Sequence, residues 1–222
     1  MISIRRPRAS EVFQKYFRYT KIGWIGQEKE VYDMKIDGVG YAKDYIRRLE
    51  TIIRGLDFDS IGRVIDELAR ARERGSTIFF MGNGGSAATA NHFANDLGVC
   101  ASPDGKTPFR SLSLASNVAF LTCLGNDFGY DSVFVRQLRN LMRPEDVVVG
   151  ISASGNSPNV VKALQFAADN QGVPIAIVGF DGGQMKKISQ LTIHVRSEKG
   201  EYGPVEDVHM ILDHLISTCL AK

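Results

Sequence analysis

The stretch that decides the fold runs from Phe79 to Asp96 and reads FFMGNGGSAATANHFAND. It begins in an apolar, β-prone run, turns on three glycines and enters a proline-free segment of helix formers. A buried strand, a glycine turn and a helix N-terminus together form an anion site, because unpaired backbone N–H groups and the positive end of the helix dipole point outward together. Ser86 is the predicted N-cap. His92 and Asp96 are four residues apart and share one helical face. An anion site followed by an imidazole and a carboxylate one helical turn apart indicates chemistry on a phosphorylated substrate.

From Gly75 onward, short apolar runs alternate with helical stretches. The expected strands are 77–81, 110–115, 146–152, 174–179 and 191–195, and the expected helices are 86–97, 118–124, 132–142, 157–170 and 205–220. Continuous β-branched runs between helices are typical of a parallel sheet that is covered on both faces. The sequence therefore predicts a three-layer α/β/α fold.

The N-terminal part has a different character. Residues 1–38 form an arm in which basic and aromatic side chains are interleaved. We expect the arm to pack on a neighbouring subunit or to be partly disordered; a nucleic-acid or membrane-surface arm is the alternative. Two amphipathic helices follow and open a domain of residues 39–222. Asp57 or Asp59 is expected to cap the second helix, and Gly75 to end it.

The bulk composition excludes several classes of protein. The chain has 222 residues, of which 44% are hydrophobic and 23% charged, with a net charge of +2, so nothing global indicates nucleic-acid binding. No apolar run approaches the roughly 20 residues that span a bilayer, and the N-terminus lacks a secretion signal, so a cytoplasmic location is expected. Cys100, Cys123 and Cys219 are expected to be reduced thiols that behave as small buried hydrophobes.

Three polar loops follow predicted strands at the edge where ligands bind in open α/β sheets. They are Gly82–Ser86, Ser152–Ser157 and Gly179–Gly183. The middle loop offers several hydroxyl and amide groups at a helix start, which suits one phosphate. GxxxxGK[ST] is absent, and the first loop lacks the last glycine of GxGxxG. A polar turn without a ligand explains any one such loop, but three in one sheet favour a site.

The last helix carries further candidates for chemistry. His209 and His214 share it with Glu206, Asp207 and Asp213, while His194 lies in a strand and is expected to be structural. A solvated helix face is the simpler explanation for one such group. Two helices that each offer a histidine and a carboxylate fit a divalent metal of the zinc type.

In the order and spacing of these motifs, residues 41–220 resemble the SIS (sugar isomerase) domain family, and within it the phosphoheptose isomerases. The similarity rests on Met81–Ser86, His92–Ala94, Gly125–Gly129, Gly150–Ser157, Asp181–Gly183 and the helix with Glu206, His209 and His214. It implies a flavodoxin-like five-stranded parallel sheet and a homotetramer with active sites between subunits and one zinc per subunit. It also implies conversion of sedoheptulose 7-phosphate to D-glycero-D-manno-heptose 7-phosphate for bacterial surface-heptose synthesis.

The resemblance assigns roles to particular residues. It places the phosphate on Ser152, Ser154 and Ser157, and Ala153 of the same loop is a further predicted substrate-binding residue. It places the sugar beside Asn83, Gly84, Gly85, Ser86, Asn126, Asp127 and Glu206. His92, Asp96, Glu206 and His214 take the metal positions, with Asp96 as base and His214 as acid. Aldose–ketose isomerisation needs such a pair, and a metal would stabilise the developing oxyanion.

Two positions depart from the family pattern. Asp96 stands where the family has a glutamate and is one methylene shorter, and Glu206 stands where the family has a glutamine. A displaced base can cost about a hundredfold in rate. Two alternatives therefore stay open: a non-catalytic SIS-domain protein that binds a sugar phosphate or a partner, and an isomerase of a different phosphosugar.

Overall fold

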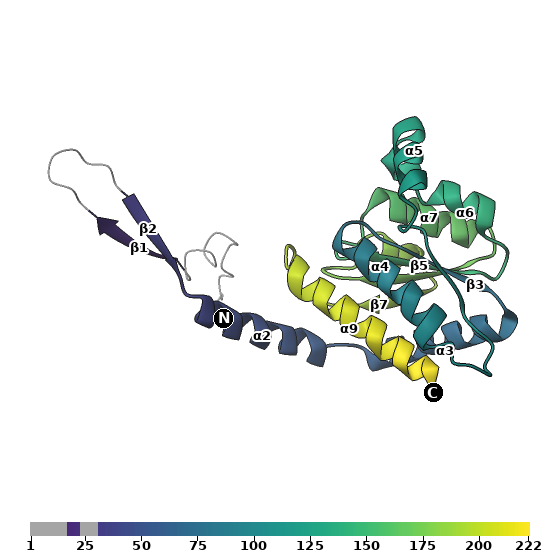
Figure 1. Ribbon diagram of the computed structural model, residues 1–222, viewed down its shortest axis with the longest axis horizontal. Coiled ribbons are helices and arrows are strands. Elements are labelled where there is room, and N and C mark those ends of the chain that lie inside the picture. The colour runs from purple at the N-terminus through teal and green to yellow at the C-terminus, as the bar shows by residue number, and fades with distance from the viewer. Residues whose placement is uncertain (1–16, 23–30) are drawn as a thin grey trace, which may run out of the picture. The chain divides into compact units, whose positions relative to one another are not determined.

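The computed structural model describes residues 17–22 and 31–222, and its largest element is a five-stranded parallel sheet (Figure 1). The strands are β3 (Thr77–Met81), β4 (Arg110–Ser113), β5 (Val147–Ser152), β6 (Val173–Val178) and β7 (Leu191–His194). Their order in the sheet, β4-β3-β5-β6-β7, is the 2-1-3-4-5 order of flavodoxin-like folds. The predicted parallel α/β architecture is confirmed.

Side chains of the central strands alternate between two apolar layers. Phe79 and Met81 of β3 join a core with helices on one face, while Phe80 stacks on Phe93 of a helix on the other face, with ring centroids 4.6 Å apart. Every residue of β5 is buried. Burial on both faces explains why these strands read as unbroken apolar runs rather than alternating ones.

Helices cover both faces of this sheet. The helices on the Phe93 side are α3 (Phe58–Arg74), α4 (Gly85–Asn95) and α9 (Tyr202–Ala221); those on the other side are α6 (Val135–Leu141), α7 (Pro158–Asp169) and the short α8 (Met185–Ile188). The helix α3 begins and ends as predicted. The Asp57 carboxylate accepts a hydrogen bond from the Ser60 N–H, and Gly75 ends the helix in the left-handed conformation.

Between β4 and α6 lies α5 (Val118–Phe128), followed by one 3-10 turn, η2 (Tyr130–Ser132). The helix α5 has no buried side chain, although its sequence is largely apolar. Val118 is 69% exposed and Phe120 is 47% exposed. Leu121 and Leu124 are partly buried against the core, but the exposed apolar side chains of α5 have the composition of a contact surface.

The described N-terminal elements are an antiparallel hairpin, β1 (Phe17–Ile22) with β2 (Val31–Ile36), and α2 (Gly38–Arg54). The hairpin was not predicted, and most basic and aromatic residues of the arm lie outside the described part or have no described side chain. The chain divides into two compact units, residues 1–50 and 51–222. The predicted boundary at residue 38 stays a prediction.

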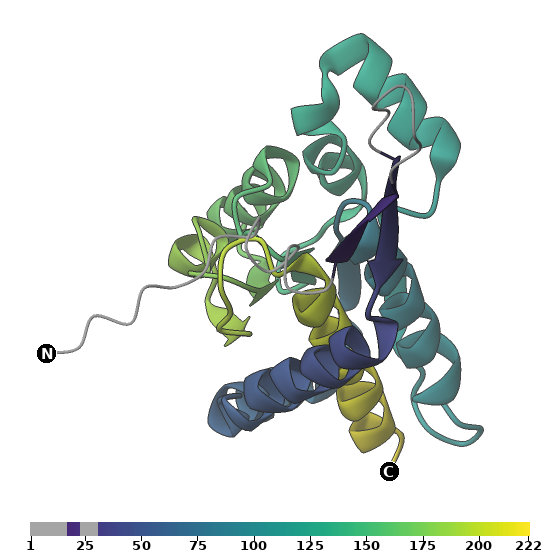
Figure 2. The ribbon, with the colours of Figure 1, turned by 90° about the vertical axis from the view of Figure 1, so that its left-hand side faces the viewer.

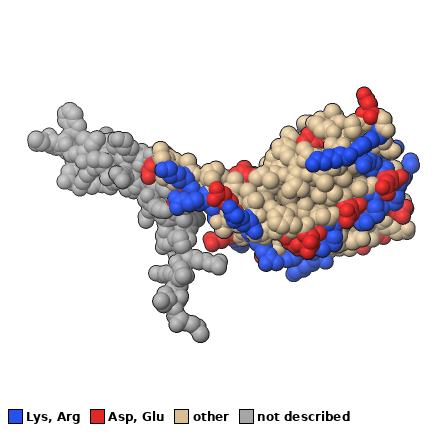
Figure 3. Space-filling model, turned by 90° about the horizontal axis from the view of Figure 1, so that it is seen from below, with Lys and Arg blue, Asp and Glu red and all other residues tan. Residues whose placement is uncertain are grey.

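Surface properties agree with the composition. In the face shown in Figure 3, basic and acidic side chains alternate next to a broad area without charge. No helix among the described residues combines the length and apolarity needed to span a membrane. The three cysteines form no disulfide, but the expectation that they are buried is wrong, because all three are exposed.

Candidate active site

The site begins at the point where the strand order reverses, between β3 and β5. The loop after β3, residues 82–86, is named the glycine loop here, and the loop after β5, residues 152–157, the serine loop. Because β3 and β5 are hydrogen-bonded neighbours, both loops leave the same edge of the sheet side by side. The crevice between such loops is where open α/β sheets bind their ligands.

In the serine loop, three hydroxyl groups converge. Ser152 Oγ lies 3.4 Å from Ser154 Oγ and 3.1 Å from Ser157 Oγ. Ser157 is the N-cap residue of α7, so the positive end of that helix dipole faces the same place. Ala153 is buried between them. Neutral donors at a helix N-terminus are well suited to a phosphate group.

The third polar loop packs against the serine loop and supports its backbone. A Cβ on Gly155 would lie 2.2 Å from the carbonyl oxygen of Gly182, so the two backbones are in direct contact. The Gln184 N–H also donates to Asn156 Oδ1, and the Met185 N–H to the Gly155 carbonyl. Gly155 has a φ of 63°, a conformation that favours glycine.

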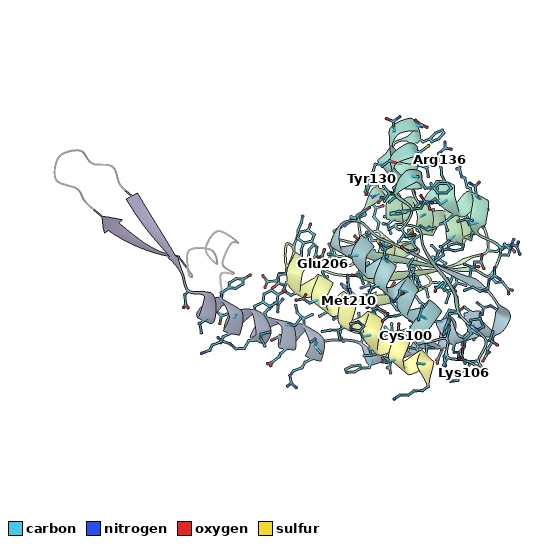
Figure 4. The ribbon with its side chains drawn as sticks, viewed as in Figure 1. Cys100, Lys106, Tyr130, Arg136, Glu206 and Met210 are labelled. Atoms are coloured by element: carbon cyan, nitrogen blue, oxygen red, sulfur yellow. The ribbon has the colours of Figure 1, made fainter. Side chains whose placement is uncertain are left out.

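In the glycine loop, the predicted capping is wrong in one detail. The helix α4 starts at Gly85 with Gly84 as its N-cap, and Ser86 lies inside the first turn with its side chain buried. The glycine at the cap, with a φ of 53°, moves the helix start two residues earlier than a serine cap would. Asn83 is held by two residues that were not predicted, Asn159 and Tyr130, of which Tyr130 is labelled in Figure 4.

Farther along, α4 and α9 bring four ligating side chains together. The two helices lie side by side (Figures 1 and 2) and run in the same direction, since Gly85 lies beside Glu206 and His92 beside His214. Each of four residues offers one ligand atom, and these four atoms all lie within 4.8 Å of one another; the residues are His92, Asp96, Asp213 and His214. We call this group the carboxylate–histidine cluster.

The backbone changes where this cluster forms. At Asp96 the helix α4 passes into one π-helical turn, η1 (Asp96–Cys100), in which the Ala101 N–H donates to the Asp96 carbonyl. Asp96 Oδ2 lies 3.5 Å from His92 Nε2. A π-turn inside a helix often marks a functional position.

Glu206 lies outside the carboxylate–histidine cluster, although we expected it to share a ligand with His214. Eight residues along a helix correspond to about 12 Å, so two residues on the same side of α9 still lie two turns apart. A Cβ on Gly85 would lie 2.3 Å from Glu206 Oε2, which places the carboxylate beside the start of α4. Figure 4 shows Glu206 at the first turn of α9.

Asp213 takes the fourth place in the cluster. It is fully buried on the apolar face of α9, where Ser217 Oγ donates to its Oδ1 and Oδ2 has no hydrogen-bond partner. Burial, reinforced by the nearby Asp96 charge, raises the pKa of Asp213 to about 6. The signal in the sequence was a carboxylate at a position where the period of the helix calls for an apolar residue.

The remaining predicted site residues are Asn126 and Asp127, both exposed on α5. Asn126 Nδ2 donates to Asp127 Oδ1, and the Cys123 thiol donates to Asp127 Oδ2. This hydrogen bond and the carboxylate charge raise the pKa of the Cys123 thiol. The described hydrogen bonds of the Asn126 and Asp127 side chains stay within α5. His194, as predicted, has a structural place: its Nε2 lies 3.0 Å from the Phe180 carbonyl oxygen.

The cluster meets the requirements of a divalent cation site. Two imidazole nitrogens and two carboxylates form the donor set that zinc accepts, and the unpartnered Asp213 Oδ2 is an acceptor without a donor inside the protein. Asp213 lies in this group and was not predicted as a ligand, whereas Glu206 is not in the group and its assignment as a ligand stays a prediction.

Comparison with known proteins agrees with this architecture. Residues 40–179 match the family model of the SIS domain. The chain is 35% identical to a probable phosphoheptose isomerase of Thermoplasma acidophilum, over 79% of this chain and 94% of that protein. It is 36% identical to a phosphoheptose isomerase of Akkermansia muciniphila, over 72% of this chain and 82% of that protein.

Among solved structures, the phosphoheptose isomerase GmhA from Neisseria gonorrhoeae has a TM-score of 0.72 and 29% identity, and the match covers 82% of this chain and 95% of that one. The sequence relatives and this structure all have phosphoheptose isomerase in their names. The chain belongs to the SIS domain family and, within it, to the phosphoheptose isomerases, and it is an isomerase.

Proposed function

We propose that this enzyme interconverts sedoheptulose 7-phosphate and D-glycero-D-manno-heptose 7-phosphate through an enediol. The observation that carries the proposal is the convergence of His92, Asp96, Asp213 and His214 from two helices. The two helices, α4 and α9, belong to the same domain as the serine loop and the glycine loop, which follow the neighbouring strands β5 and β3. Proton-transfer groups and a phosphate cradle on one domain are what isomerisation of a sugar phosphate needs.

The serine loop binds the phosphate in this proposal. Ser152, Ser154 and Ser157 donate hydroxyl hydrogens, and the N-terminus of α7 contributes its dipole. The glycine loop, with Asn83, Gly84, Gly85 and Ser86, lines the sugar. Asn126 and Asp127 are exposed on α5, and the proposal places them at the sugar of a site shared with a second copy of the chain.

Asp96 and His214 transfer the protons. The Asp96 carboxylate removes a proton from C1 of the ketose while His214 protonates the C2 oxygen, which gives the enediol. In the second half, a proton returns to C2 and the C1 hydroxyl loses its proton, which gives the aldose. Each group has a second ligating atom, so it can serve both the cluster and the substrate.

His92, Asp96, Asp213 and His214 are the residues that would hold a divalent cation such as zinc. When bound, the cation supplies positive charge beside the oxygen that becomes negative in the enediolate. Asp213 is fully buried, so it would bind the cation from the protein interior and would not contact the substrate. His92 and His214 are exposed and accessible to substrate.

The proposal also includes assembly into a homo-oligomer, which is a tetramer if this chain assembles as its resemblance to the phosphoheptose isomerases implies. It places the enzyme in the cytoplasm. Support comes from the exposed apolar side chains of α5, which a single chain leaves uncovered. A role in the synthesis of surface heptose follows from the substrate.

The direct test is incubation with sedoheptulose 7-phosphate in deuterated water, with and without added zinc. We expect aldose product that carries solvent deuterium at C2, and we expect its loss in Asp96→Asn and His214→Gln variants. Arabinose 5-phosphate and fructose 6-phosphate serve as shorter competing substrates. Faster turnover of either of them, or turnover in Asp96→Asn equal to wild type, would contradict the proposal.

A further inference from the structure

Asn83 and Asn159 form a closed pair of side-chain hydrogen bonds across the switch point. Asn83 Nδ2 donates to Asn159 Oδ1, and Asn159 Nδ2 donates to Asn83 Oδ1, both over 2.9 Å. Asn83 belongs to the glycine loop, whereas Asn159 is the second residue of α7, directly after the serine loop. Asn159 is 2% exposed, so water does not replace these bonds easily. The pair joins the two loops.

One backbone contact decides which way both amides point. The Val160 N–H, which can only donate, lies 3.0 Å from Asn159 Oδ1, so this atom must be the amide oxygen. Asn83 must then direct its Nδ2 at that oxygen. Its own Oδ1 accepts from Asn159 Nδ2 and also from the Tyr130 hydroxyl at 2.9 Å.

This arrangement leaves Asn83 with one unused polar group. Its oxygen accepts two hydrogen bonds, which fills both lone pairs, and one of its two N–H groups is taken by Asn159. Among the residues that the structure describes, the second N–H has no hydrogen-bond partner. Asn83 is half-buried near the start of the glycine loop, so this N–H is the part of the side chain that a ligand can meet.

We infer that Asn159 is a positioning residue of the isomerase, which fixes the spacing between the serine and glycine loops and makes Asn83 a hydrogen-bond donor to an oxygen of the sugar. The inference rests on the proposed function, which assigns the phosphate to one loop and the sugar to the other. A displacement of about 1 Å between them would cost roughly a hundredfold in rate. A phosphate ion by itself contacts only the serine loop and does not depend on the pair.

The test variant is Asn159→Asp, which keeps the shape and the acceptor for Val160 but replaces the Nδ2 donor with an oxygen that faces Asn83 Oδ1. Asn140→Asp, the same change at an exposed position near the end of α6, is the matched control. For each protein, calorimetry gives the Kd of inorganic phosphate and of sedoheptulose 7-phosphate, and kinetics give kcat and KM. Thermal unfolding shows whether each variant is folded.

We expect Asn159→Asp to bind inorganic phosphate within about twofold of wild type, to bind the sugar phosphate roughly tenfold more weakly and to lose about a hundredfold in kcat. The control should match wild type. Tyr130→Phe removes an exposed donor without disturbing the core and should shift the sugar phosphate Kd in the same direction by a smaller factor. It keeps the inference testable if Asn159→Asp does not fold.

A double-mutant cycle shows whether Asn159 acts through Asn83. If it does, Asn83→Ala combined with Asn159→Ala is no more impaired in kcat than Asn83→Ala alone. Additive losses, or equal losses of phosphate and sugar phosphate affinity, would overturn the inference. A wild-type protein that binds the sugar phosphate without converting it would contradict the proposed function. The role of Asn159 would still be tested by whether Asn159→Asp weakens binding of the sugar phosphate more than binding of inorganic phosphate. Binding of neither ligand would overturn both.

Discussion

His92 on α4 and His214 on α9 meet with their Nε2 atoms 3.2 Å apart, although 122 residues separate them in the chain. The rings meet edge to face, at 71° and 5.1 Å between centroids. Two neutral imidazoles at this distance share one proton, with one nitrogen donating and the other accepting. In a cation-bound cluster, both histidines would serve as ligands.

The identity of the fourth ligand can be tested by metal titration. After chelator treatment, Asp213→Asn should bind zinc more than about a hundredfold more weakly than wild type, because even the outer partners of ligands typically contribute 10- to 100-fold. Glu206→Gln should stay within about threefold, since Glu206 lies beside Gly85 and not in the cluster. Calorimetry with zinc alone measures both. The reverse pattern would make Glu206 the ligand.

Two buried groups on α9 give the free energy of unfolding opposite pH dependences. Burial lowers the pKa of His209 to about 4, so its contribution is complete above the ordinary value of 6.5 and is lost as the pH falls through about 4. Burial raises the pKa of Asp213 from 3.8 to about 6, so its contribution is complete below 3.8 and is lost as the pH rises through about 6.

Removal of either titratable group should therefore change, in a defined direction, the slope of the free energy of unfolding against pH. In the metal-free protein between about pH 4 and 6, His209→Leu makes the slope of stability against pH more negative, and Asp213→Asn makes it more positive. Each change is limited to about 1.4 kcal/mol per pH unit. Urea unfolding of the two variants and wild type across this range measures the slopes. Slopes that shift in the same direction in both variants would contradict the assignment.

Two glycine-to-alanine variants can separate the energetic effect of the backbone contact between residues 155 and 182 from the cost of a left-handed backbone conformation. Gly155 and Gly105 both have a positive φ, but a Cβ on Gly105 meets nothing within 4 Å, whereas one on Gly155 meets the Gly182 carbonyl. Gly105→Ala should cost about 1–2 kcal/mol of stability, the usual penalty of that conformation. Gly155→Ala should cost clearly more and abolish phosphate binding. Equal losses in urea unfolding would show that the loops are not in tight contact.

The uncovered helix α5 predicts self-association. Phe120→Lys should shift the protein toward smaller species in light scattering, because it places a charge on an apolar surface that a second copy would cover. Gln165→Lys adds the same charge at an exposed position of α7 and should leave the mass unchanged. A wild-type protein that is monomeric at micromolar concentration would contradict this prediction.

The parallel sheet could be predicted from the sequence because it depends on local pattern. Apolar β-branched runs such as VVVGIS, bounded by turns and helices, have few other ways to bury both faces. Caps such as Asp57 and Gly75 depend on neighbours within four residues and were predicted for the same reason. The antiparallel pair of β1 and β2 was missed, since the alternation of apolar and polar residues breaks at Thr20-Lys21 and at Val31-Tyr32.

For the site, the sequence by itself determined only the candidate side chains: the three serines, Asn83, His92, Asp96 and His214. Only the tertiary structure decided which of them meet. The parallel packing of α4 and α9 brings Asp213 into the cluster and leaves Glu206 two turns away, beside Gly85. Helical spacing fixes the faces of each helix, but contacts between residues more than a hundred positions apart depend on how the helices pack, and no single-helix pattern encodes that register.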